Sequence, residues 1–155
     1  MQAPDITIRE ADRHDVAAIA AILAADTLGG HGDTTDPAAL PGYLAAFDRI
    51  AASPCETLYV AERNGEVVAT CQTLATTTLS GRGGTSMIVE TVFTRPDCRG
   101  QGIGAMMIHH CVDRARRQGM RRVQLTSNAA RKDAHRFYER LGFTQSHLGF
   151  KLQLK

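Results

Sequence analysis

The stretch from Thr85 to Gly104 reads TSMIVETVFTRPDCRGQGIG and decides the fold. Its first ten residues are rich in β-branched and apolar side chains, which predicts a strand. Three glycines in five residues (Gly100–Gly104) then precede an amphipathic segment, 103–118, that predicts a helix closed by Gly119. Glycines at such a turn let backbone N–H groups approach a ligand, and the helix N-terminus adds partial positive charge. The stretch therefore predicts a phosphate-binding turn, with a tight turn that binds nothing as the alternative.

The sequence narrows the choice of phosphate ligand. No G-K-[ST] follows the glycines, so a P-loop is excluded. Gly100-x-Gly102-x-x-Ala105 matches the loose dinucleotide fingerprint, which also needs an acidic residue at the end of the next strand. The next strand and its end read VQLTS over 123–127, with no carboxylate. The nicotinamide interpretation is therefore weak.

The remaining elements predict an α/β domain over 1–155 with a mixed sheet. Asn64-Gly65 between two β-rich runs predicts a hairpin. Asp12 is expected to cap the first helix, with Asp15 as its capping-box partner. The strands are expected at 5–10, 57–63, 66–74, 85–94, 123–126, 143–144 and 148–154, and the helices at 13–25, from about 37 to 52, at 103–118 and at 131–141.

The charge is unevenly distributed along the chain of 155 residues, whose formal net charge is +2. Residues 1–90 carry five Lys/Arg and twelve Asp/Glu, a net of −7, while residues 91–155 carry thirteen and four, a net of +9. The cationic part indicates an anionic partner, either nucleic acid or a phosphate-bearing small molecule.

Several absences bound the function. The sequence has no apolar run long enough for a transmembrane helix, and residues 1–5 do not resemble a signal peptide, so we expect a cytoplasmic protein without a membrane partner. The four cysteines form no C-x-x-C pair and show no metal-ligand spacing with the histidines. We therefore expect reduced thiols and no metal.

The motif Arg99-x-x-Gly102-x-Gly104, after the strand Ile88–Phe93, resembles the acetyl-CoA-binding motif of the GNAT superfamily of N-acetyltransferases. The opening Ile8–Asp12, the Asn-Gly hairpin and the late Ala134–Phe143 element, A-x-x-F-Y-x-x-x-G-F, resemble that family in the same order. The resemblance implies a GNAT-like acyl-CoA N-acyltransferase fold, with a mixed central sheet of six to seven strands flanked by about four helices.

The resemblance also implies where acetyl-CoA, the acetyl donor, binds. The family often has Asn at the position of Arg131, so that either Arg131 or the nearby Asn128 is expected to take this contact. The expected donor-binding residues are Val92, Phe93, Thr94, Arg99, Gly100, Gln101, Gly102, Ile103, Gly104, Ala105, Asn128, Arg131 and His135.

Glu90 is the candidate general base for direct attack by an amine, which the resemblance implies. Its same-face neighbours in a regular strand are Ile88 and Val92. A carboxylate among apolar groups holds a proton more readily, which suits a base working near neutral pH. A Glu paired with Arg, or one reaching solvent, is the alternative.

Tyr138 is the candidate general acid, since the resemblance implies that its phenol protonates the departing CoA thiolate. The alternative is a helix aromatic packed beside Phe137. The family builds the acceptor site from the first helices and hairpin loops, which here means Leu28–Thr35, Tyr43 and Thr78–Thr85. The acceptor is expected to be a small-molecule or peptide amine, and the charge of 1–90 suits a cationic one.

Two other functions stay open at this point. The basic run Arg114–Arg122 permits a nucleic-acid-binding module, although it lacks interleaved aromatics, so no nucleic-acid partner is expected. A CoA-binding sensor without catalysis is the second alternative, and the presence of Glu90 and Tyr138 argues against it. The alternating apolar residues of Leu148–Leu154 leave a homodimer as a possibility.

Overall fold

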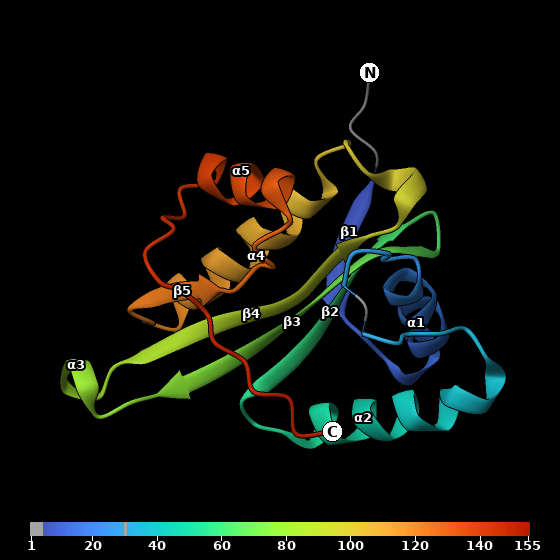
Figure 1. The fold of residues 1–155 in the computed structure, drawn as a ribbon, viewed down its shortest axis with the longest axis horizontal. Coiled ribbons are helices and arrows are strands. Elements are labelled where there is room, and N and C mark those ends of the chain that lie inside the picture. Colours follow the sequence, from blue (N-terminus) through green and yellow to red (C-terminus); the bar gives the residue numbers. More distant parts are fainter. Residues whose placement is uncertain (1–4, 30) are drawn as a thin grey trace. The chain divides into compact units, whose positions relative to one another are not determined.

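The computed structural model describes residues 5–29 and 31–155, which form two compact units that meet between Leu125 and Thr126 (Figure 1). The first unit contains a sheet with the strand order β1-β2-β3-β4-β5. Neighbouring strands from β1 to β4 are antiparallel, whereas β5 runs parallel to β4. The predicted mixed sheet with one β-α-β crossover is thus confirmed. The strands are β1 (Ile6–Glu10), β2 (Glu56–Arg63), β3 (Glu66–Thr77), β4 (Thr85–Thr94) and β5 (Arg122–Leu125).

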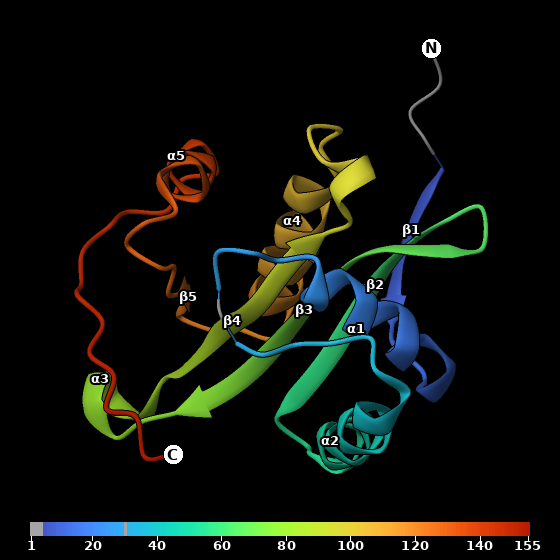
Figure 2. The ribbon, with the colours of Figure 1, turned by 45° about the vertical axis from the view of Figure 1, so that its right-hand side comes forward.

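Helices cover both faces of this sheet. Figure 2 shows α4 on one face and α1 and α2 on the other. The buried apolar residues between these layers include Val60, Val68 and Val89 of β2, β3 and β4, Ile19 of α1 and Ile103 of α4. The helices of this unit are α1 (Val16–Ala24), α2 (Leu40–Ala52), the short turn α3 (Ser80–Gly83) and α4 (Ile103–Arg117), with 3₁₀ turns at Arg13–Asp15, Pro37–Ala39 and Pro96–Cys98.

The predicted caps and turns are confirmed. The Asp12 side chain accepts a hydrogen bond from the His14 N–H at 2.8 Å, and the Asp15 carboxylate accepts from the Asp12 N–H at 2.8 Å. Asn64 and Gly65 have φ of 54° and 79°, as a two-residue hairpin turn with both central residues left-handed requires. Gly119 N–H donates to the Arg116 carbonyl at 3.0 Å and ends α4.

Arg9 fixes the start of the first helical segment to the sheet. Its guanidinium binds both carboxylate oxygens of Asp15, at 2.7 and 2.9 Å, and reaches Glu62 of β2 at 2.8 Å. These bonds hold the pKa of Asp15 below its usual value, although burial opposes the shift.

The second unit, from Thr126 onward, contains α5 (Lys132–Arg140). Gly142, with φ of 94°, follows the helix, and the Phe143 N–H donates to the Tyr138 carbonyl at 3.1 Å. The expected strands at 143–144 and 148–154 are wrong, because these residues adopt no regular structure.

The failed strands have a physical reason. Alternation gives a segment one apolar face, but a strand also needs a neighbour for its backbone hydrogen bonds. Among the described residues the strands that pair are β1 to β5, residues 148–154 are not part of this ladder, and Phe150 is 92% exposed. The sheet of the described residues accordingly has five strands instead of six to seven.

Candidate functional site

A β-bulge interrupts β4 at the centre of the candidate site. Gln72 of β3 pairs with Glu90, whereas Thr70 pairs with Phe93, so one residue of β3 faces two of β4. Thr91 lies in this bulge with φ of 55°, an outlier for a β-branched residue that costs about 1–3 kcal/mol. Bulges of this kind redirect side chains and are over-represented beside active sites.

The bulge changes which side chains share a face with Glu90. Residues paired across strands point to the same face, so Phe93 lies on the face of Glu90. The expectation that Val92 would share this face is wrong, because it assumed an uninterrupted strand. The expected burial is also wrong, since Glu90 is exposed. The structure agrees with the alternative in which the Glu90 carboxylate reaches solvent.

Glu90 faces the side of the sheet that α1 and α2 cover. The Sγ atoms of Cys71 in β3 and Cys111 in α4 lie 3.6 Å apart, so Cys71 points toward α4. Gln72 and its partner Glu90 therefore point to the opposite face. On that face the Gln72 amide donates to the carboxylate of its diagonal neighbour Glu56 at 3.3 Å, which places Glu56, Gln72 and Glu90 in a diagonal row across three strands.

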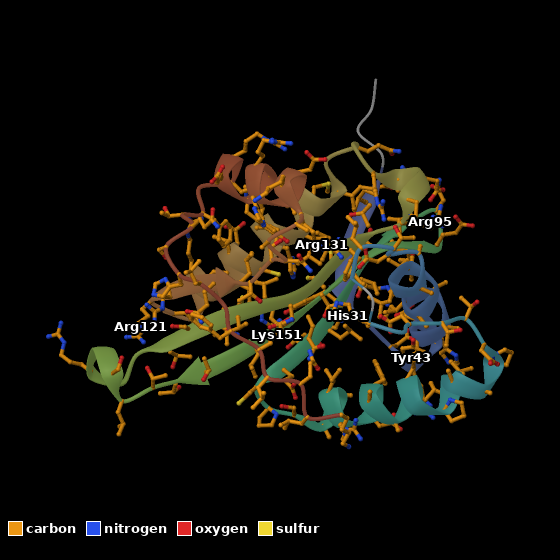
Figure 3. The ribbon with its side chains drawn as sticks, in the orientation of Figure 1. His31, Tyr43, Arg95, Arg121, Arg131 and Lys151 are labelled. Atoms are coloured by element: carbon orange, nitrogen blue, oxygen red, sulfur yellow. The ribbon has the colours of Figure 1, made fainter. Side chains whose placement is uncertain are left out.

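A loop and a pocket lie on the α1–α2 side. The loop after α1 passes in front of β3 and β4 in both ribbon views (Figures 1 and 2), and Figure 3 labels His31 and Tyr43 there. The Tyr43 hydroxyl donates to Asp33 at 2.8 Å and accepts from the Thr34 N–H at 3.1 Å. Gly30 of the expected acceptor loop lies outside the described residues.

The pocket has a volume of about 240 Å³ and lies where α2 ends and β2 begins. Glu56 lines it together with the apolar Phe47 and Ile50. Glu10 also borders the pocket, but its carboxylate pairs with Arg114 of α4 at 3.4 Å. This mixture suits a ligand that has a cationic group on an apolar arm.

The remaining part of the expected acceptor site, Thr78–Thr85, is a turn held by Arg121. The Arg121 guanidinium donates to the Ser80 carbonyl at 3.1 Å and to the Thr78 hydroxyl at 3.0 Å. The backbone N–H of Arg121 donates to the Thr85 carbonyl at 2.9 Å. Arg121, one of the arginines of the basic run Arg114–Arg122, therefore forms its hydrogen bonds within the protein.

The glycine loop leads directly into α4. Gly100 and Gly102 have φ of 72° and 81°, and Gly102 is the residue that caps the helix. A Cβ built at either glycine meets nothing within 4 Å, so the space before the loop is open. The first intrahelical hydrogen bond runs from the Met106 N–H to the Gly102 carbonyl. The N–H groups of the first turn, from Gly102 to Ala105, have no such partner and can bind an anion.

Polar side chains brace this loop from outside. The Arg99 guanidinium donates to the Thr94 carbonyl at 3.2 Å, and the Gln101 amide donates to the Asp97 carbonyl at 3.3 Å. The residues expected to bind the donor in the first unit therefore lie along one continuous stretch: Val92, Phe93 and Thr94 at the end of β4, Arg99–Gly102 in the loop, and Ile103, Gly104 and Ala105 in the first turn of α4.

The second unit holds the other expected donor residues. Asn128 accepts hydrogen bonds from the Ala130 N–H with its side chain and from the Arg131 N–H with its carbonyl, both at 2.9 Å. His135 Nε2 lies 2.9 Å from the same Asn128 carbonyl, so Nε2 carries the proton. Arg131 immediately precedes α5.

Tyr138 is half-buried in α5 and makes edge-to-face contacts with Phe137 and Phe143, at centroid distances of 5.1 and 5.8 Å. This packing agrees with the alternative that Tyr138 is an aromatic residue packed beside Phe137. Whether its hydroxyl also acts as a general acid stays a prediction.

Within residues 5–29 and 31–155 no group of His, Cys, Asp and Glu has the arrangement of a metal site. No helix in this part of the chain is long and apolar enough to cross a membrane.

Sequence reasoning missed two residues near the site. Thr91 was missed because nothing in a regular β pattern signals a bulge. Arg63 was missed because its partner is 38 residues away: its guanidinium donates to the Gln101 amide oxygen at 2.7 Å.

Comparisons with known proteins agree on one family. Residues 16–143 match the family model described as Acetyltransferase (GNAT) family. An uncharacterized N-acetyltransferase, YhdJ of Bacillus subtilis, is 34% identical over 103 residues, which cover 66% of this chain and 71% of that protein. The aminoalkylphosphonate N-acetyltransferase of Salmonella typhimurium is 38% identical over 91 residues, 59% of this chain and 58% of that protein.

A solved structure is similar over nearly the whole chain. It is described as a transcriptional regulator from Bacillus halodurans, is 36% identical, and matches with a TM-score of 0.92 over 96% of this chain and 99% of that one.

Proposed function

Because the chain belongs to the GNAT family of acetyltransferases and is an acyltransferase, we propose that it transfers the acetyl group of acetyl-CoA to a primary amine by direct attack in a ternary complex. The observation that carries the donor assignment is the glycine loop before α4. Its left-handed glycines leave the N–H groups of the first helical turn open to an anion. The pyrophosphate of the donor matches this site.

The pantetheine arm then runs along the end of β4. Val92, Phe93 and Thr94 lie between the glycine loop and the bulge, so their backbone groups are available to it. Phe93, on the face of Glu90, brings this segment next to the general base. In the second unit, Asn128, Arg131 and His135 complete donor binding in this proposal, and Tyr138 protonates the leaving thiolate.

Glu90 receives the proton of the attacking amine, directly or through water. Its exposure and its position on the α1–α2 face support this role, because an acceptor entering from that face meets the carboxylate first. The bulge at Thr91 supports it too, since strained backbone is concentrated at functional sites.

The acceptor binds on the α1–α2 face, between the loop fixed by Tyr43 and the row Glu56–Gln72–Glu90. Glu56 stands two strands from Glu90 and is displaced by two residues along the strands, so the two residues are about 12 Å apart; Glu56 also lines the pocket at the end of α2. An amine that bears a second cationic group, such as a polyamine, fits two carboxylates at this spacing. The Salmonella relative makes an aminoalkylphosphonate the natural competing acceptor.

The test is a steady-state assay of thiol release with a panel containing a polyamine, lysine, an aminoglycoside and an aminoalkylphosphonate. We expect Glu90→Gln to lower kcat by about 10²–10⁴-fold and to flatten the pH profile. Tyr138→Phe is expected to lower kcat while acetyl-CoA affinity stays close to wild type. Wild-type turnover across pH in either variant would overturn that residue's role, and binding of acetyl-CoA without transfer to any amine would favour a sensor.

A further inference from the structure

Arg63, the last residue of β2, connects the Asn-Gly hairpin to the glycine loop. One terminal nitrogen of its guanidinium donates to the Gln101 side-chain oxygen at 2.7 Å, and the other lies 2.9 Å from the Cys98 sulfur. The other end of the Gln101 amide donates to the Asp97 carbonyl. Gln101 stands between the two left-handed glycines, and its side chain is thus held at both ends.

A second connection runs beside the first. The Arg95 guanidinium binds both oxygens of Asp97, at 2.7 and 3.0 Å, and reaches Glu66, the first residue of β3, at 3.2 Å. Figure 3 shows Arg95 beside the turn between β2 and β3. Hydrogen bonding to Arg95 holds the pKa of Asp97 below its usual value. Both strands of the hairpin are therefore tied to the segment that leads into the loop.

The two connections differ in charge. Arg95 is paired with carboxylates, whereas the hydrogen-bond partners of Arg63 among the described residues are the amide oxygen of Gln101 and the sulfur of Cys98. Arg63 thus forms no ion pair with a carboxylate among the described residues. A guanidinium in this state adds positive potential where an anionic ligand would lie.

We propose that Arg63 is a positioning residue of the donor site: acting through Gln101 and Cys98, it holds the glycine loop in the shape that binds the pyrophosphate of acetyl-CoA. The inference rests on the proposed function, because it requires the donor to bind at this loop. Gly100 and Gly102 carry no side chain that could pack and order the loop. A loop fixed before binding avoids the entropy cost of ordering during binding.

The experiment is calorimetric titration with acetyl-CoA of the wild type, Arg63→Ala, Arg63→Lys and the control Arg116→Gln. Arg116 is an exposed arginine of α4 with an ion pair to Asp113, so its replacement removes the same charge away from the loop. We expect Arg63→Ala to raise Kd about tenfold. Arg63→Lys should recover only part of the loss, because one ammonium group cannot span both partners. Arg116→Gln should bind as the wild type does.

Two further readouts separate positioning from general damage. With saturating donor, kcat of Arg63→Ala should stay within about twofold of the wild type, so that the loss is confined to KM for acetyl-CoA. S-acetyl-pantetheine, which lacks the phosphates, should have the same KM in both proteins. A fall in kcat, or an equal loss with acetyl-pantetheine, would show that Arg63 does not act through the phosphate site.

A double-mutant cycle of Arg63 and Gln101 tests whether Arg63 acts through Gln101. Gln101 is exposed, so its replacement should not prevent folding. Gln101→Ala should weaken acetyl-CoA binding, and the double variant should bind about as Arg63→Ala does. Additive losses would overturn the proposed coupling. If the wild type does not bind acetyl-CoA, the proposed function fails; if the wild type binds and Arg63→Ala binds equally well, only this inference fails.

Discussion

Replacing Gly102 by alanine separates the stability of the glycine loop from its binding function. Gly102 has φ of 81°, and a Cβ at this position meets nothing within 4 Å. The cost to folding is therefore backbone strain, about 1–2 kcal/mol for a residue in the left-handed region. A smaller entropy of the unfolded chain offsets part of it, which leaves about 1 kcal/mol. We expect Tm to fall by about 2–4 °C.

The effect on donor binding is expected to be larger. The added methyl group obstructs the close approach of the pyrophosphate to the N–H groups of the first turn. Losing one hydrogen bond to a charged group costs about 1.5–3 kcal/mol, which is about 10- to 150-fold in Kd. Calorimetric titration with acetyl-CoA measures this directly.

Gly119→Ala is the matched control. Gly119 follows the other end of α4, has φ of 68°, and also has open space around its Cβ position. The two variants should lose similar stability, while only Gly102→Ala loses donor affinity. Equal acetyl-CoA affinity in the two variants would refute the assignment of the pyrophosphate to this loop.

Three further predictions concern the rest of the molecule. The Tyr59 hydroxyl is buried and has no hydrogen-bond partner among the described residues, so Tyr59→Phe should keep or raise the urea midpoint, and a loss above about 1 kcal/mol would contradict this. Burial, together with the charges of Arg117 and Arg114, lowers the pKa of His110 in the folded protein. The neutral imidazole therefore contributes its full share of stability above pH 6.5, the ordinary pKa, and this share is lost as the pH falls through the lower pKa of the folded state. The urea midpoint should therefore depend less on pH between 7.5 and 5.5 in His110→Gln, and an unchanged pH dependence would count against it. A thiol reagent should titrate Cys55 alone in the native protein, because the other three cysteines are buried, and rapid reaction of a second thiol would show that the core opens.

Local signals predicted most of the first unit from the sequence. The boundaries of β4 agree with the expected strand, and the cap at Asp12, the turn at Asn64-Gly65 and the end of α4 at Gly119 are all confirmed. Each of these is set by residues within one or two turns of chain, where a cap or a left-handed glycine has few alternatives.

The errors arose where partners are distant in the sequence. The strand expected at 148–154 needs a neighbour that its own pattern cannot specify, and the bulge at Thr91 depends on its register with β3. Arg63 binds a loop that lies in a different part of the sequence. The wrong neighbour expected for Glu90 follows from the unforeseen bulge.

The basic run of the C-terminal half now has a partial explanation within the protein. Arg114 pairs with Glu10, and Arg121 holds the turn at α3. A thermal-shift titration with duplex DNA tests the remaining alternative, a nucleic-acid-binding module. A shift with acetyl-CoA and none with DNA is the expected outcome.

The most direct test of the account follows a labelled acetyl group. The wild-type protein is incubated with acetyl-labelled acetyl-CoA and the amine panel, and free thiol, acetylated amine and intact protein mass are measured together. With direct transfer in a ternary complex, labelled amine and free CoA form in equal amounts while the protein stays unlabelled. Failure to acetylate any amine, or label retained on the protein as an acyl-enzyme, would contradict direct transfer in a ternary complex.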